Sequence, residues 1–166
     1  IIYEVVMKKV GILMGSKSDY DVVKQAIDVL KDFGVETEVR IISAHRTPDE
    51  ADEYASTARD RGLGVIIAAA GKAAHLGGVL AARTTLPIIG LPIQTSMMGG
   101  LDSLLSIVQM PQGVPVASVG VGAGLNAGLL AVQMLAIEDT ALSQKFSAYK
   151  QNMADKIRKD DEALKD

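Results

Sequence analysis

The sequence predicts a three-layer α/β/α fold built on a flavodoxin-like, doubly wound parallel sheet. Five short runs of almost continuous apolar residues recur along the chain, a pattern typical of strands that helices cover on both faces. Segments with helical spacing separate these runs, so strand and helix alternate, and the short connections imply right-handed crossovers. With 166 residues, of which 48% are hydrophobic, the chain is expected to form a single domain over residues 1–166.

The five strands are expected at Val10 to Met14, Val35 to Ile42, Val65 to Ala70, Pro87 to Leu91 and Val114 to Val121. The second run alternates more than the others because Glu36, Glu38 and Arg40 interrupt it. A strand with this partly polar pattern has fewer apolar side chains that helices must bury. We therefore expect it near an edge of the sheet.

Helical spacing lies between the strands, at Tyr20 to Phe33, Pro48 to Arg61, Ala73 to Thr84, Leu101 to Val108 and Asn126 to Ile137. The final segment, residues 138–166, places many charges around a few apolar positions and predicts a C-terminal amphipathic helix. Its apolar stripe either packs on the domain or forms an arm that grips a neighbouring subunit. At the other end, Met7 followed by two lysines resembles a natural start, so residues 1–6 are treated as an upstream extension.

The composition excludes several classes of function. A net charge of -3 leaves no basic surface excess to neutralise a phosphate backbone, so nucleic acid is not an expected partner. No apolar run approaches the roughly 18 to 20 residues of a membrane span, so no membrane partner is expected either. The chain has no cysteine, which excludes thiolate chemistry and disulfides and suits a reducing cytoplasm. We expect a cytoplasmic protein.

The first candidate site follows the first strand, in the segment Gly15-Ser16-Lys17-Ser18-Asp19. Ligands of parallel sheets bind outside the carboxyl ends of the strands, so residues in these loops are the first to be considered functional. Glycine permits close approach of the backbone, hydroxyls and amides at a helix start hold phosphate, and an aspartate can bond a ribose hydroxyl. An ordinary helix cap by Ser18 or Asp19 is equally consistent with the pattern.

The second candidate site follows the second strand, in Ser43-Ala44-His45-Arg46-Thr47-Pro48. Thr47 is expected to cap the next helix, with Pro48 at its first position. Imidazole exchanges protons near neutral pH, which makes His45 a candidate general acid and base. Arg46 can make a forked contact with phosphate or carboxylate.

The third candidate site follows the third strand and contains the only other histidine, His75. Both histidines are therefore expected at the same edge of the sheet. The glycines of this loop, among them Gly71, let the backbone come close to a planar ligand.

The loop after the fourth strand, residues 94–100, is a possible wall or lid, while Asp102 and Ser103 are expected to cap the helix that follows it. Two histidines without a third ligand at a recognisable spacing do not predict a metal site. The first loop also lacks the fingerprints of nucleotide triphosphate and dinucleotide binding, so no cofactor is expected.

Together these motifs resemble one family, the purine-pathway carboxyaminoimidazole ribonucleotide mutases of the bacterial class I type. The resemblance covers nearly the whole chain and rests on five segments, which are Met14 to Asp19, Ser43 to Pro48, Ala73 to Leu76, Asp102 to Pro111 and Asn126 to Leu130.

The resemblance implies an isomerase that needs neither ATP nor metal. It would move a carboxylate from the exocyclic nitrogen of 5-(carboxyamino)imidazole ribonucleotide to carbon 4 of the ring, through trapped carbon dioxide. It also implies a homo-octamer and assigns the proton transfers to His45. The implied substrate-binding residues are Gly15, Ser16, Ser18, Asp19, Ser43, Ala44, Arg46, Ala70, Gly71, Lys72, Ala73, His75 and Leu76.

The third loop departs from the motif that this family usually has, Gly-Ala-Gly-Gly-Ala-Ala-His-Leu-Pro-Gly-Met. This chain reads Ala69-Ala70-Gly71-Lys72-Ala73-Ala74-His75-Leu76-Gly77-Gly78-Val79. Lys72 adds a charge that faces either a substrate carboxylate or solvent. Gly77 in place of proline is expected to loosen the loop.

Two other functions fit parts of the pattern. A class II enzyme of the same fold carboxylates aminoimidazole ribonucleotide with free carbon dioxide, but those enzymes lack the histidine and alanines found here at Ala73 to Leu76. A nonenzymatic module that binds a phosphate-bearing ligand fits each loop taken singly.

Overall fold

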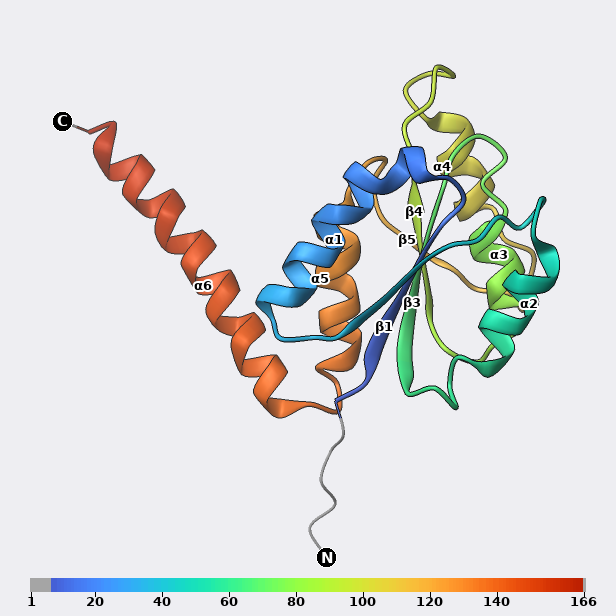
Figure 1. Ribbon diagram of the computed structural model, residues 1–166. Coiled ribbons are helices and arrows are strands. Elements are labelled where there is room, and N and C mark those ends of the chain that lie inside the picture. The colour runs from blue at the N-terminus through green and yellow to red at the C-terminus, as the bar shows by residue number, and fades with distance from the viewer. Residues whose placement is uncertain (1–6, 166) are drawn as a thin grey trace, which may run out of the picture.

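The computed structural model describes residues 7–165, so the suggested extension at residues 1–6 lies outside the described residues. Its strands are β1 (Lys9–Met14), β2 (Thr37–Ile41), β3 (Leu63–Ala70), β4 (Ile88–Pro92) and β5 (Ala117–Ser118). The helices are η1 (Lys17–Asp19), α1 (Tyr20–Asp32), α2 (Pro48–Thr57), α3 (Leu76–Ala81), α4 (Leu101–Val108), α5 (Gly124–Leu135) and α6 (Thr140–Ala163), as Figure 1 shows.

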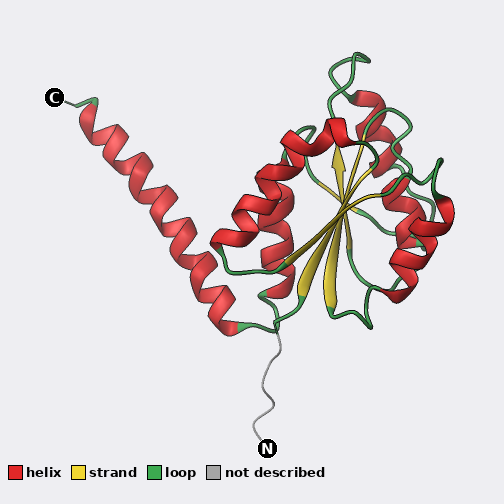
Figure 2. Ribbon diagram, viewed as in Figure 1, coloured by secondary structure: helices red, strands yellow, loops and turns green. Residues whose placement is uncertain are grey.

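The strands form one parallel sheet in the order β2-β1-β3-β4-β5, which confirms the flavodoxin-like, doubly wound topology (Figure 2). The chain winds outward in opposite directions from the β1/β3 boundary, which makes that boundary the switch point where ligands bind in open α/β sheets. Within the sheet, Met14 pairs with Ile41 on one side and Ala69 on the other. The first three strands therefore end at the same level, and the loops that follow them start side by side.

Two apolar cores lie on the two faces of the sheet. One includes Val10, Ile12 and Ile67 and is covered by α1 and α5, and the other includes Leu13, Ile66 and Leu80 and is covered by α2, α3 and α4 (Figure 1). Strands buried on both faces explain the nearly unbroken apolar runs. The charged second run is β2 at an edge of the sheet, which confirms its predicted position.

Several element boundaries differ from those predicted. The last strand is only two residues long, because Pro115, which offers no backbone N–H to a neighbouring strand, interrupts the predicted run just before it. Helix α3 starts at Leu76 instead of Ala73, because residues 72–75 form tight turns in which the amides of Ala74 and His75 donate to the carbonyls two residues earlier. Helix α2 ends at Thr57, four residues before its predicted end.

The predicted terminal helix is present as α6, which begins two residues after the predicted start because Asp139 caps it, accepting a hydrogen bond from the amide of Leu142 at 2.9 Å. Only its first turns touch the domain, where Leu142 is buried and Phe146 and Tyr149 pack on Phe33 with ring centroids 5.9 and 5.7 Å away. The rest of α6 extends away from the body (Figure 1). No helix within residues 7–165 has both the length and the apolar character required to cross a membrane.

Candidate active site

A pocket of about 570 Å³ lies at the carboxyl ends of β1, β3 and β4, at the switch point of the sheet. All fourteen residues that the sequence assigned to the site line it, and residues 93–96 complete the lining. The rule that loops after parallel strands share one edge therefore places these residues correctly. Their chemical roles stay predictions.

The loop after β1 forms a pocket wall with two hydroxyls and a buried carboxyl. The hydroxyl oxygen of Ser16 accepts from the amide of Ser18 at 3.3 Å and lies 2.9 Å from the hydroxyl oxygen of Ser18. Ser16 thus caps η1, while Asp19, at the start of α1, makes no capping hydrogen bond. Burial raises the pKa of the Asp19 carboxyl above its ordinary value, and a hydrogen bond from Ser18 opposes part of that effect.

The loop after β2 is closed on itself by Thr47. Its hydroxyl oxygen accepts from the amide of Ser43 at 2.9 Å and donates to the carbonyl of Ser43 at 3.1 Å. Thr47 is the N-cap residue of α2, as predicted, but its side chain makes no capping hydrogen bond because this hydroxyl is engaged within the loop. Pro48 does occupy the first position of α2, as predicted.

Arg46 ties the first two loops together. Its guanidinium donates to the carbonyl of Gly15 at 2.9 Å and to the hydroxyl of Ser43 at 3.4 Å. The side chain remains exposed on the pocket lining, so its other donors stay available to an anionic ligand.

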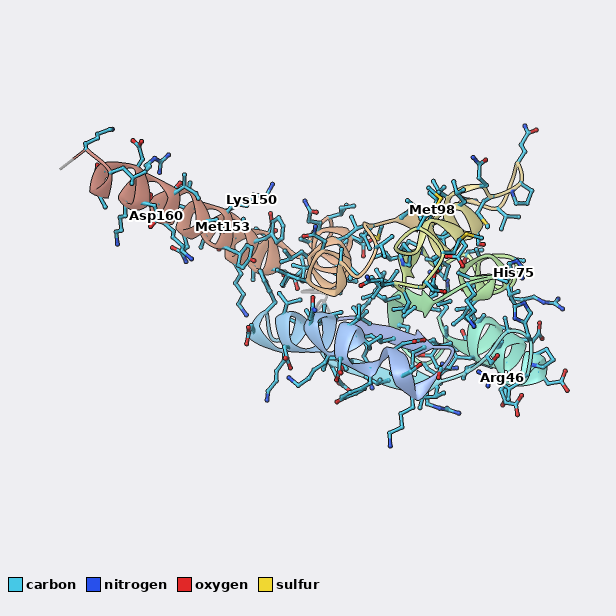
Figure 3. All side chains as sticks on the ribbon, turned by 90° about the horizontal axis from the view of Figure 1, so that it is seen from above. Arg46, His75, Met98, Lys150, Met153 and Asp160 are labelled. Carbon is cyan, nitrogen blue, oxygen red and sulfur yellow. The ribbon has the colours of Figure 1, made fainter. Side chains whose placement is uncertain are left out.

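The two histidines meet in the pocket. Nε2 of His45 lies 2.8 Å from Nδ1 of His75, and the rings cross edge to face with centroids 4.9 Å apart. The two residues come from loops 30 positions apart, so the contact depends on the strand order. Both rings are exposed, and Figure 3 places Arg46 and His75 at the same end of the molecule.

The loop after β3 is held in an unusual backbone conformation. Lys72 has φ of +56°, a left-handed conformation that disfavours residues with a side chain. Its amide donates to the hydroxyl oxygen of Ser103 at 2.9 Å. Ser103 lies on α4 and is fully buried, so the expected helix cap instead anchors the pocket wall that precedes His75.

The loop after β4 forms the remaining wall of the pocket, which is one of the two roles expected for it. Thr95 donates to a carboxylate oxygen of Asp102 at 2.6 Å, and this hydrogen bond lowers the pKa of Asp102. The backbone then passes through three successive left-handed residues, Met98, Gly99 and Gly100, so the tip is a sharp turn with Met98 exposed (Figure 3). The position of this loop after a buried strand indicates that it lines the pocket. The types of its residues do not indicate this by themselves.

Among residues 7–165, no three side chains of His, Cys, Asp or Glu come close enough together to hold a metal ion.

Comparison with known proteins decides the family. The sequence model described as AIR carboxylase matches residues 9–156. The chain belongs to the AIR carboxylase family. Among relatives, the N5-carboxyaminoimidazole ribonucleotide mutase of Pyrococcus abyssi is 56% identical over 147 residues, covering 89% of this chain and 84% of that protein. The mutase of Thermotoga maritima is 54% identical, covering 89% and 86% of the two chains.

A solved structure of an AIR carboxylase relative agrees with the fold. The crystal structure of Treponema denticola PurE is similar with a TM-score of 0.86 and 30% identity, covering 96% of this chain and 99% of that one. Membership in the AIR carboxylase family therefore rests on both the sequence and the three-dimensional arrangement.

Lys72 departs from the AIR carboxylase motif at the position where the left-handed backbone favours glycine. We expect Lys72→Gly to raise the free energy of unfolding by about 0.5 to 1 kcal/mol, because relief of the backbone strain exceeds the entropy that glycine adds to the unfolded chain. Thermal unfolding followed by circular dichroism measures the gain. A loss of stability in Lys72→Gly would mean that the lysine side chain makes favourable contacts that outweigh the strain.

Gly77 lies in the first turn of α3, so the expectation that it loosens a loop is corrected. A Cβ at this position would meet its nearest neighbour, Val116, at an ordinary distance of 3.6 Å. The first turn of a helix also leaves its amides without intrahelical acceptors, which suits proline. We expect Gly77→Pro to stabilise the fold by about 0.5 to 1 kcal/mol. Unfolding in urea measures the gain in stability. Gly78→Pro is the matched comparison, because a Cβ at that position would press on the side chain of Met110.

Proposed function

We propose that this chain converts 5-(carboxyamino)imidazole ribonucleotide to 4-carboxy-5-aminoimidazole ribonucleotide, in the manner of an N5-carboxyaminoimidazole ribonucleotide mutase. The proposal is supported by relatives with that name at more than half identity. The observation that carries it is the pocket itself, which brings an imidazole, an exposed guanidinium and two serine hydroxyls to one switch point.

The phosphate and ribose fit the wall formed by the first two loops. Ser16, Ser18 and Arg46 offer hydroxyl and guanidinium donors, which suit phosphate oxygens. The Asp19 carboxyl beside them is positioned to accept from a ribose hydroxyl. This arrangement leaves the imidazole ring of the substrate to extend toward the histidines.

The reacting end fits the opposite wall, which is lined by small residues. Ala70 and Leu76 are buried, and Gly71 and Ala73 line the same surface. The small side chains at these positions leave room for carbon dioxide, which favours its recapture by the ring.

His45 is proposed as the acid and base of the reaction. Breaking the bond between the exocyclic nitrogen and its carboxylate requires a proton on that nitrogen and releases carbon dioxide. Attack of carbon 4 on the carbon dioxide then requires loss of the proton on that carbon. The two proton transfers cancel, so the enzyme needs a group that gives one proton and takes one back near neutral pH, as imidazole does.

The direct test mixes the purified protein with the carboxyamino substrate in bicarbonate-free buffer. Formation of the carbon 4 carboxylate at a rate that added bicarbonate does not change supports the mutase. Turnover only from aminoimidazole ribonucleotide and carbon dioxide would instead select the class II reaction. Saturable binding without any conversion would select a nonenzymatic binding module.

We infer that the protein acts as a homo-octamer and that α6 contacts a neighbouring copy. Helix α6 extends away from the domain beyond its first turns (Figure 1). In this outer part, Met153 and Ile157 are 47% and 67% exposed. Contact with another copy would bury these two apolar side chains and thereby stabilise the outer part of the helix. A cytoplasmic location remains part of the proposal, since a chain without cysteine suits a reducing compartment.

Deleting residues 151–166 should therefore lower the oligomeric state. Sedimentation velocity measures the mass of the assembly, and Met153→Glu with Ile157→Glu tests the same contact in the full-length chain. Lys156→Glu together with Lys159→Glu, which changes only charged positions, is the control. An intact chain that sediments as a monomer would contradict the octamer, and an unchanged octamer in the deletion variant would contradict the role of α6.

A further inference from the structure

We propose that the ammonium group of Lys72 binds the carboxylate that the reaction moves, and that the pocket thereby discriminates carboxylated nucleotides from aminoimidazole ribonucleotide. The inference rests on the proposed mutase function and adds a specificity-determining residue to it. It is drawn from the place of Lys72 in the pocket lining, from its left-handed backbone and from its lack of an ion-pair partner among residues 7–165.

Lys72 lies in the wall that is proposed to face the reacting end of the substrate. Its neighbours in the loop after β3, Gly71 and Ala73, also line the pocket but carry no polar side-chain group. Among the lining residues that the structure describes, the other permanent cation is Arg46, which donates to the carbonyl of Gly15 in the first loop. The two cations therefore lie on the two walls proposed to hold the two ends of the substrate.

Helix α4 holds the backbone of Lys72 in its strained conformation. The φ angle of +56° lies in the region that glycine adopts without cost and lysine does not. The amide of Lys72 donates to the hydroxyl of Ser103 at 2.9 Å, and its carbonyl lies 3.3 Å from the hydroxyl of Ser106, which also donates to the carbonyl of Asp102. These contacts fix the point from which the lysine side chain starts. Strain that the surrounding structure maintains in this way is typical of ligand sites.

The ammonium group of Lys72 has no ion-pair partner within the described residues. The carboxylate of Asp102, beside the serine that anchors the loop, accepts hydrogen bonds from the hydroxyl of Thr95 and the amide of Ser103 instead. The carboxyl group of the pocket lining, Asp19, belongs to the loop after β1 and is buried. The cation is therefore available to an anionic group of a ligand.

The substrate offers such a group, and aminoimidazole ribonucleotide does not. The carboxyamino substrate and the carbon 4 product each carry a carboxylate at the ring, whereas all three nucleotides share the phosphate and the ribose. The exocyclic nitrogen and carbon 4 are attached to or part of neighbouring ring positions, so the flexible side chain of one lysine can reach the carboxylate at either. A charge-assisted hydrogen bond from the ammonium group then adds affinity that the nucleotide without a carboxylate cannot gain.

The test measures the dissociation constants of 4-carboxy-5-aminoimidazole ribonucleotide and of aminoimidazole ribonucleotide by calorimetry, in the unmodified protein and in Lys72→Met. Methionine keeps a long side chain at the left-handed position and removes the charge. We expect Lys72→Met to bind the carboxylated nucleotide about tenfold more weakly and aminoimidazole ribonucleotide within about twofold of the original affinity. The KM for the carboxyamino substrate should rise by about the same factor as the first dissociation constant.

Two control variants separate the charge of Lys72 from its surroundings. Lys72→Arg keeps a cation and should keep most of the discrimination. Lys17→Met removes an exposed lysine of η1 that is not part of the pocket lining, so it should leave the ratio of the two affinities unchanged. Added salt should lower that ratio in the unmodified protein, because it screens the ion pair, and should not lower it in Lys72→Met.

Two results would overturn the proposal. One is an unchanged affinity of Lys72→Met for the carboxylated nucleotide. The other is a parallel loss for both nucleotides, which would show that Lys72 attracts the shared phosphate and not the carboxylate. Either result in an unmodified protein that converts the carboxyamino substrate leaves the proposed function intact. If the unmodified protein binds neither nucleotide, the proposed function and this inference fail together.

Discussion

Replacing His45 with asparagine should lower turnover by about 10³-fold while changing substrate affinity little. The asparagine amide is smaller than imidazole and cannot gain and lose a proton near neutral pH. The groups proposed to hold phosphate and ribose, Ser16, Ser18 and Arg46, keep their own hydrogen bonds, which do not involve the His45 ring. The loss should therefore fall on kcat. Rapid-quench assays for turnover and calorimetry for substrate binding separate the two quantities.

The matched control is Glu50→Gln, an exposed neutralisation in the first turn of α2, five residues further along the chain. It should leave turnover and binding unchanged. Unchanged turnover in His45→Asn would remove this residue from the proton transfers. A parallel loss of binding and of thermal stability would instead give His45 a structural role.

Much of the fold could be predicted because strands that are buried on both faces have apolar residues at nearly every position. The runs around Ile12, Ile67 and Ile89 are apolar at nearly every position, and all three side chains are fully buried. The less regular run containing Glu38 is an edge strand, where burial is weaker. These patterns depend only on which layer covers each residue.

The parts that could not be predicted depend on contacts between distant segments. Helix α3 starts late because the preceding loop is anchored through the amide of Lys72 to Ser103 on α4, 31 residues away. Thr47 has the sequence position of a helix cap, yet its hydroxyl bonds to Ser43 across the loop. Local propensity carries no information about either partner.

The sequence predicted where the candidate site lies in the fold, but it did not predict which side chains contact one another there. Strand ends at the same level, set by the pairing of Met14 with Ile41 and Ala69, bring the predicted loops together at one pocket. The direct contact of His45 with His75 follows from the turn geometry of two separate loops, which the spacing of histidines along the chain does not encode.

The second large expected effect is a loss of stability when the close packing of α1 on α5 is disturbed. Gly124 and Gly128, one helical turn apart on α5, both face α1. A Cβ at Gly124 would overlap the carbonyl oxygen of Val22, and one at Gly128 would overlap the side chain of Val29. The two glycines thus allow a backbone approach that no other residue permits. The segment around Gly128 contributes to the family resemblance, and here the role of this glycine is close packing.

We expect Gly124→Ala to lower the free energy of unfolding by about 3 kcal/mol, although alanine favours helix over glycine by about 1 kcal/mol. The added methyl group must displace backbone, which cannot move aside as a flexible side chain does. For a chain of this size the melting temperature should fall by roughly 10 °C. Calorimetry measures the shift.

Asn126→Ala is the matched control, because it introduces the same residue two positions later on the exposed face of α5. It should leave the melting temperature nearly unchanged or slightly higher. Equal melting temperatures in the two variants would contradict the packing argument. Because α1 begins directly after the loop that carries Ser16 and Asp19, displacement of α1 should also disturb the proposed phosphate and ribose wall. Folded Gly124→Ala should therefore have a raised KM, with a smaller change in kcat than His45→Asn, since the histidine pair lies on the other two loops.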